Sequence, residues 1–374
     1  MISLIIECCK TDQNTTNIKK FISDIHNWKE FINLAFSHGV FPLVYHTLKT
    51  HDKLIANDIL KSMKTYNRNI AQQNMLMSAE LIKLMKLLKE NNIEAIAFKG
   101  PTLAKIAYGD IALRQYVDLD ILVNKNVIDK TEKLLETIFY KPEHILEMYQ
   151  KKKLEDVVHD RAFQNIKNNV RVECHWVLSS GEFFIDMNKW NDLQSPTFQA
   201  IQNKPIPTLS NEKLLVYLCV HGYKHMWERV EWLVDIVMLD LNNDIDYKDV
   251  LKIAKNIDAN RVVLSSLILC QKILNMHLSN EIKKCIKNEK KLLNISDKML
   301  SKIIATYNNP SKKSQHSKQM SLLQFLILTT YKSKFQYLKT LLSPTENDYQ
   351  IVKLPKYLNF VYYLIRPFNI LFKF

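Results

Sequence analysis

Apolar side chains recur at steps of three and four residues over the first ninety positions, which is the period of a helix with one buried face. Trp28, Phe31 and Ile32 fall on such a face, and the stretch 67–91 carries the same pattern among lysines and glutamates. The pattern predicts an N-terminal helical region over residues 1–90.

Beyond position 90 the pattern changes to short apolar or alternating runs, which are typical of strands. Lys99-Gly100-Pro101 ends the first run, and Pro suits the first turn of the helix that follows. A polar turn, 167–169, joins the last two runs. The pattern predicts a small α/β unit over 91–180, with strands at 93–98, 116–123, 158–166 and 170–176 and helices at 102–108 and 127–139.

After Trp176 the helical period returns, and a polar stretch at 308–318 is expected to be a loop. We therefore expect an α+β fold, in which a small mixed β-sheet is flanked by the helical regions 1–90 and 181–374. Candidate helices are 212–227, 232–241 and 247–257, with more to about 307.

The composition excludes two common nucleotide-binding designs. The chain has only 5 glycines and neither a G-x-G-x-x-G nor a Walker A sequence, so Rossmann and P-loop folds do not fit. Its six cysteines include no C-x-x-C pair, which favours reduced thiols. With no secretory leader and no apolar run long enough to span a membrane, the expected location is the cytoplasm.

Positive charge is concentrated near the end of the chain. The formal net charge is +14, and residues 281–374 hold 17 basic against 5 acidic side chains. This region could attract nucleic acid, anionic lipid or an anionic substrate, or it could be a solvated lysine-rich surface. The aromatic residues of 354–374 fit a membrane or nucleic-acid surface, but packing against the helices is favoured, because soluble proteins rarely expose so large an apolar patch. Pro355 and Pro367 should also interrupt a long interfacial helix.

Two aspartates on the strand 116–123 carry the strongest chemical signal. Alternation sends Val117, Leu119 and Ile121 to a core and places Asp118 and Asp120 on the opposite face, about 7 Å apart. A divalent cation would relieve the repulsion between these carboxylates, and oxygen ligands suit Mg²⁺ or Mn²⁺. The alternative is a pair of exposed acids beside lysines.

A third acid lies on the strand 170–176, whose polar face carries Arg171, Glu173 and His175. If this strand lies beside the first, Glu173 can reach the same metal ion. Three carboxylates around metal are typical of phosphoryl transfer, in which the third orients or deprotonates an attacking hydroxyl. His175 is a weaker candidate for substrate binding.

These segments resemble a known family, the uncharacterised nucleotidyltransferases of bacterial polysaccharide and peptide-modification gene clusters, within the DNA polymerase beta-like superfamily. The resemblance is carried by FKGPTLAKIAYGDIALRQYVDLDILV at 98–123, VRVECHWVL at 170–178, LCVHGYKHMWERVEWLVDIVMLD at 218–240 and YYLIRPFNILFKF at 362–374. It implies that Asp118 and Asp120 are the metal pair and Glu173 the third carboxylate.

The resemblance also implies that Gly100 opens a helix whose N–H groups meet phosphate. The superfamily usually has Ser after this glycine, whereas this chain has Pro, so Thr102 would have to supply the hydroxyl contact. Lys99 and Arg114 are expected to supply charge to the phosphates.

His221 and His225 stand four residues apart on an expected helix, with Glu228 nearby. Three interpretations stay open: a zinc site, recognition of the acceptor or base, and satisfied core histidines. Trp227 and Trp232 would pack or stack beside them. The later Asp235 could pair with Arg229 or a histidine, and a purely structural role is an equal alternative.

The sequence therefore predicts an enzyme that transfers a nucleoside monophosphate from an NTP to a hydroxyl or phosphate acceptor on a small molecule, sugar, protein or peptide. Two alternatives are a non-catalytic nucleotide-binding regulatory protein and an RNA nucleotidyltransferase. The basic C-terminal quarter favours the second, and the intact set of three acids argues against the first.

Overall fold

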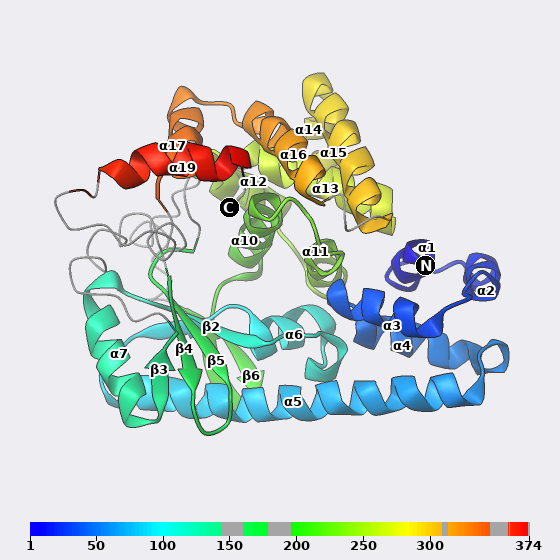
Figure 1. Ribbon diagram of the computed structural model, residues 1–374, viewed down its shortest axis with the longest axis horizontal. Helices are drawn as coiled ribbons and strands as arrows, with labels where there is room; N and C mark the ends of the chain where they lie inside the picture. The colour runs from blue at the N-terminus through cyan, green and yellow to red at the C-terminus, as the bar shows by residue number, and fades with distance from the viewer. Residues whose placement is uncertain (144–159, 179–195, 309–312, 345–357, 359, 373–374) are drawn as a thin grey trace.

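The N-terminal region is helical, as predicted. The computed structural model describes residues 1–143, 160–178, 196–308, 313–344, 358 and 360–372. Its longest helix, α5, underlies both the sheet and the N-terminal helices (Figure 1) and begins ten residues before the predicted position. The bounds are α1 (Ile2–Cys8), α2 (Thr15–Ser23), α3 (Trp28–Ser37), α4 (Phe41–Leu48), the 3₁₀-helix η1 (Lys49–Leu54) and α5 (Asn57–Glu90).

A five-stranded mixed sheet follows, in the order β1-β2-β5-β4-β3. The pair β2 and β5 is parallel, and the other neighbours are antiparallel. The four predicted strands are confirmed with shorter bounds, and β3 was not predicted. The elements are β1 (Ala95–Ala97), α6 (Gly100–Tyr108), η2 (Ile111–Leu113), β2 (Asp118–Val123), η3 (Lys125–Val127), α7 (Ile128–Thr137), β3 (Tyr140–Pro142), β4 (Asp160–Asn165) and β5 (Arg171–His175).

A β-hairpin precedes the C-terminal helices, so the expectation that helices return directly after Trp176 is wrong for residues 197–208. Its strands are β6 (Thr197–Ile201) and β7 (Lys204–Thr208). Gln202 and Asn203 both have positive φ, as tight two-residue hairpin turns require. A Gln-Asn turn lacks the glycine that usually reveals such a hairpin in a sequence.

The C-terminal region is helical. The predicted loop at 308–318 is wrong for 313–318, which begin a helix, while 309–312 lie outside the described residues. The helices are α10 (Asn211–Lys224), α11 (Glu231–Asn242), α12 (Tyr247–Asn256), α13 (Asn260–Leu274), α14 (Asn280–Lys287), α15 (Lys290–Asn308), α16 (Lys313–Ile327), α17 (Tyr331–Leu342) and α19 (Val361–Phe372). Among the described helices, none combines the length and the apolar composition that a membrane span requires.

The end of the chain packs less closely than predicted. Tyr362 is buried, but Phe360 and Tyr363 are 62% and 56% exposed. Helix α19 also continues through Pro367, so this proline does not interrupt it. The packing prediction is therefore right for Tyr362 and wrong for its two neighbours, while Tyr357 and Phe374 lie outside the described residues.

Two hydrophobic clusters hold the molecule together. One lies between α5 and the sheet and includes Leu84 and Ile121. The other joins the N-terminal helices to α10–α15, with Phe31 and Leu267 among its members. Val117 belongs to neither, because β2 begins only at Asp118; the side chain is 70% exposed, and its prediction as a core residue is wrong. The division into regions 1–90, 91–180 and 181–374 stays a prediction.

Candidate active site

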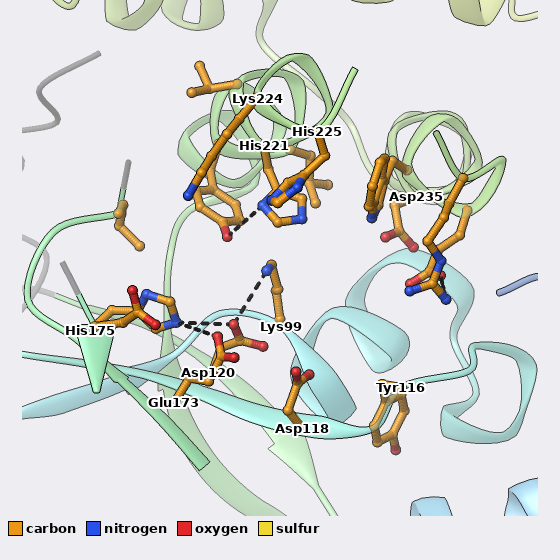
Figure 2. A pocket seen from close by; sticks show the side chains of 18 of the residues that line it. Lys99, Tyr116, Asp118, Asp120, Glu173, His175, His221, Lys224, His225 and Asp235 are labelled. Atoms are coloured by element: carbon orange, nitrogen blue, oxygen red, sulfur yellow. Dashed lines mark hydrogen bonds and ion pairs between the residues drawn. The ribbon is translucent and has the colours of Figure 1, made fainter. Parts of the chain in front are cut away.

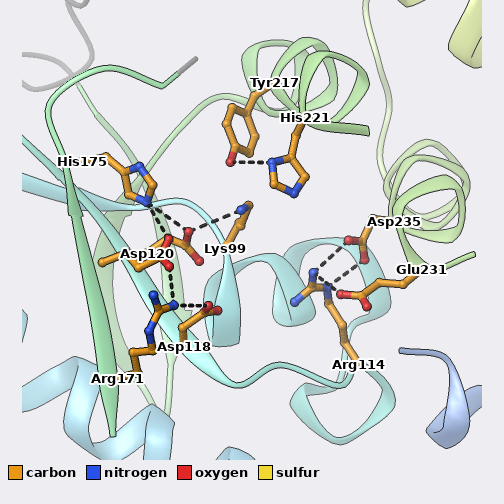
Figure 3. Close-up of polar contacts among 11 residues, drawn as sticks. Lys99, Arg114, Asp118, Asp120, Arg171, His175, Tyr217, His221, Glu231 and Asp235 are labelled. Atoms are coloured by element: carbon orange, nitrogen blue, oxygen red, sulfur yellow. Dashed lines mark hydrogen bonds and ion pairs between the residues drawn. The ribbon is translucent and has the colours of Figure 1, made fainter. Parts of the chain in front are cut away.

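The register of β2 and β5 brings the predicted acids together. Asp120 lies opposite Glu173, and Asp118 lies opposite Arg171, in a parallel pair. The sheet side of the site is thus a two-by-two arrangement of three carboxylates and one guanidinium. Figure 3 shows the guanidinium of Arg171 beside Asp118. Asp120 is buried, whereas Asp118 and Glu173 are partly exposed.

Two cationic side chains balance the buried Asp120. Lys99 Nζ lies 3.3 Å from Asp120 Oδ1, and His175 Nε2 lies 3.2 Å from the same oxygen and 3.4 Å from Glu173 Oε2. Burial by itself would raise the pKa of Asp120, but Lys99 and His175 hold it below its usual range. Burial would lower the pKa of His175, but its bonds to Asp120 and Glu173 raise it to about 9.

Arg171 neutralises the other two acids and was not predicted as a site residue. Its guanidinium donates to Asp118 Oδ2 at 3.2 Å and also to Glu173, while its Nε donates to Glu143 at 2.6 Å. The alternation of β5 placed Arg171 on the polar face, which was the available signal. Despite Arg171, burial and the neighbouring Asp120 and Glu173 raise the pKa of Asp118.

Gly100 opens α6 directly behind the acid strand. Its φ is +54°, and a Cβ there would lie 3.1 Å from the Asp118 carbonyl oxygen. A side chain would therefore meet both backbone strain and a close contact. Thr102 is fully buried, and its Oγ1 has no hydrogen-bond partner among the described residues. It does not line the cavity above the acids, so its contact with phosphate stays a prediction.

Arg114 lies at the edge of the same cavity but is held in a buried ion network. Its Nε donates to Asp235 Oδ1 at 2.8 Å and its Nη2 to Glu231 Oε1 at 3.1 Å (Figure 3). Tyr108 also donates to Asp235, at 2.7 Å. The prediction that Asp235 pairs with Arg229 or a histidine is wrong, and a phosphate-binding role for Arg114 stays a prediction.

Side chains of α10 and α11 form the wall opposite the acids. Figure 2 shows His221, His225 and Lys224 facing Lys99 and the carboxylates. The cavity between them has a volume of about 380 Å³. Trp232, which the sequence placed as a packing or stacking surface beside the histidines, completes this wall together with Tyr217, which was not predicted as a site residue. A volume near 400 Å³ is in the range of pockets that bind small ligands.

The donor set fits a divalent metal ion at the acids rather than at the histidine pair. Oxygen atoms of Asp120 and Glu173 and a nitrogen of His175 lie within 4.8 Å of one another, and in the described residues no such group includes His221 and His225. Asp120 Oδ2 is buried without a hydrogen-bond partner in the described part of the chain. This unpartnered carboxylate oxygen is the kind of atom that a cation satisfies.

Comparison with known proteins identifies the family of this chain. Residues 24–275 match the model of a family described as uncharacterised nucleotidyltransferases. The chain belongs to this nucleotidyltransferase family. The match contains the whole sheet, all three acids and the wall of α10 and α11. It ends before residues 362–374, so the resemblance of the last segment stays a prediction.

Two solved structures similar to this nucleotidyltransferase are distant matches. The solution structure of the antibiotic-resistance factor ANT(2'')-Ia is 12% identical and covers 65% of this chain and 99% of its own, with a TM-score of 0.30. An antigenic nucleotidyltransferase-like protein from Paracoccidioides brasiliensis is 16% identical. The match covers 55% of this chain and 96% of that protein, with a TM-score of 0.31. TM-scores this low carry no argument. Among curated proteins nothing matches.

Proposed function

We propose that this nucleotidyltransferase transfers a nucleoside monophosphate from an NTP to a hydroxyl or phosphate group of a small molecule, sugar, protein or peptide. The observation that carries the proposal is the parallel register of Asp120 with Glu173, next to Asp118, at the floor of a ligand-sized cavity. Family membership supports nucleotidyl transfer, and the cavity chemistry supports a polyphosphate donor.

Asp118, Asp120 and Glu173 would hold Mg²⁺ or Mn²⁺, and His175 is close enough to contribute a nitrogen once it has lost its proton. When bound, such an ion supplies charge neutralisation to the phosphates. Lys99, already beside Asp120, adds a second positive charge at the same place. Glu173 positions the acceptor and takes its proton. The acceptor oxygen forms a bond to the α-phosphorus as the bond to pyrophosphate breaks.

The test is incubation of the purified chain with each of the four NTPs, Mg²⁺ or Mn²⁺, and panels of sugars, peptides and small hydroxyl compounds. The readouts are pyrophosphate release and the mass of the products. We expect release that requires metal, and a mass increase of one nucleoside monophosphate on an acceptor or on the protein. Asp120→Asn is the inactive control. Equal turnover by this variant would overturn the proposal.

An RNA acceptor is a second candidate, favoured by the basic C-terminal quarter. If the protein recognises RNA specifically, binding should persist at about 0.2 M salt. Binding that depends on charge attraction alone should be lost by that concentration. A filter-binding titration at two salt concentrations separates the two cases.

We also propose a cytoplasmic location, since all six cysteines are free thiols and five of them are buried.

A further inference from the structure

Three aromatic rings contact one another on the cavity wall opposite the acids. The ring centroids of His221 and His225 are 4.6 Å apart, those of His225 and Trp232 are 5.1 Å apart, and those of His221 and Trp232 are 5.7 Å apart. All three residues line the cavity and are only partly buried. We call His221, His225 and Trp232 the ring wall.

An unusual turn between α10 and α11 assembles this wall. Met226 and Trp227 both have positive φ, at 57° and 54°, which is costly for side chains of this size. Trp227 packs against Gly222, where even a Cβ would lie 1.9 Å from the indole ring. The turn brings His225, at the end of α10, against Trp232, on the first turn of α11. Strain of this kind persists where the surrounding structure enforces it and is concentrated at functional sites.

A short chain of contacts links the ring wall to the acids. Lys99 Nζ contacts Asp120 and lies 5.5 Å from the centre of the Tyr217 ring. The Tyr217 hydroxyl lies 3.5 Å from His221 Nδ1. Burial and the nearby Lys99 lower the pKa of His221, so its imidazole is neutral at pH 7. The cavity thus has one end at Lys99 and the acids, which suits phosphates, and another end where aromatic rings line the wall with Lys224 beside them.

We propose that the ring wall stacks the nucleobase of the NTP, while its phosphates lie at Lys99 and the acids. The inference rests on the proposed function, because it places the second half of the same donor. The two ends of an NTP match the two ends of the cavity, since an NTP carries a polyphosphate at one end and a flat ring at the other. A hydroxyl or phosphate acceptor has no requirement for a flat ring. Stacking tolerates different bases because each has a π-face.

The experiment compares the affinities of ATP and inorganic tripolyphosphate, both with Mg²⁺, for the wild type and Trp232→Ala, by calorimetry. Removing one stacking partner should weaken ATP binding by about 5- to 150-fold. Tripolyphosphate, which has no base, should bind equally to both proteins. Trp232→Phe should restore most of the ATP affinity. Trp28→Ala is the matched control, because Trp28 is also partly buried but lies on α3, outside the cavity lining.

Each remaining outcome is decisive. Unchanged ATP affinity in Trp232→Ala, in a protein that melts like the wild type, would overturn the ring wall and leave nucleotidyl transfer intact. Equal weakening of ATP and tripolyphosphate would also overturn it, because the substitution would then have disturbed the phosphate end. Failure of the wild type to bind either compound would instead overturn the proposed function.

Discussion

At the scale of single residues, the two strand aspartates share one sequence pattern but differ in electrostatic environment. Asp120 is buried against Lys99 and His175, which favour its charged form. Asp118 faces Asp120 and Glu173, and burial and this repulsion favour its neutral form. The pattern D-x-D predicts one role for both, whereas the fold gives their charges opposite effects on stability.

Asparagine substitutions should separate these effects. Both Asp118→Asn and Asp120→Asn should abolish metal-dependent NTP turnover. Without metal, Asp118→Asn should keep or raise the melting temperature, because a repelled charge is removed. Asp120→Asn should lower the free energy of unfolding by about 1–3 kcal/mol, because Lys99 and His175 lose a charged hydrogen-bond acceptor. Thermal melts in EDTA check the difference; equal shifts for both variants would contradict it.

Glu173→Gln tests the role of the third acid. If Glu173 acts on the acceptor, kcat should fall at least about 100-fold, the lower range for a general base. The Kd of the NTP should change much less. Steady-state kinetics with a binding titration give both values. Unchanged turnover with both Mg²⁺ and Mn²⁺ would exclude a catalytic role for Glu173.

His38, at the end of α3, should make stability depend on pH. Its Nδ1 accepts from the Val230 N–H at 3.4 Å, and burial, with Arg229 nearby, lowers its pKa to about 4. Glu231, whose N–H donates to the His38 carbonyl, and the Tyr307 ring also face it. The unfolded chain takes up this proton near pH 6.5, but the folded chain does not. Stability should therefore fall as pH falls from about 6.5 to 4.

The contribution of His38 is isolated by comparison with His38→Asn, whose amide oxygen can accept the same hydrogen bond. As the pH falls from about 6.5 to 4, the free energy of unfolding of the wild type should decrease by up to about 1.4 kcal/mol more per pH unit than that of this variant. Urea melts at half-unit steps measure the difference. Parallel pH profiles would show that His38 takes up its proton in the folded state.

At the scale of elements, the turn from α10 to α11 depends on one glycine. Gly222→Ala would force the Trp227 ring to move, because its atoms lie about where the new Cβ would be. We expect the free energy of unfolding to fall by about 1–3 kcal/mol, as at other overpacked sites. ATP binding should also weaken, because the ring wall would be displaced. Melting temperature and ATP titration check both effects. Unchanged stability would mean that the turn relaxes freely.

At the scale of the whole molecule, the N-terminal and C-terminal helices belong to one hydrophobic cluster. Phe31, on α3, is fully buried within it. Phe31→Ala should cost about 3–5 kcal/mol, and both regions should unfold together. Far-UV circular dichroism and tryptophan fluorescence should give coincident transitions. Two separated transitions would instead favour independent units, with a boundary near residue 90.

The sequence by itself determined the local features of the site. Alternation along β2 and β5 put Asp118, Asp120 and Glu173 on polar faces, because the period of a strand is set by the backbone. The helices followed from their apolar period for the same reason. The hairpin of β6 and β7 was missed, because neither its short strands nor its Gln-Asn turn has a strong local signal.

The tertiary structure decided which of these residues meet. The register of β2 against β5 paired Asp120 with Glu173 and inserted Arg171 among the acids. Arg114 became the partner of Asp235, 121 residues away, and the ring wall formed where α10 and α11 fold back on each other. Such contacts depend on the packing of segments far apart in the chain, and a local pattern fixes the face of a residue but not its partner.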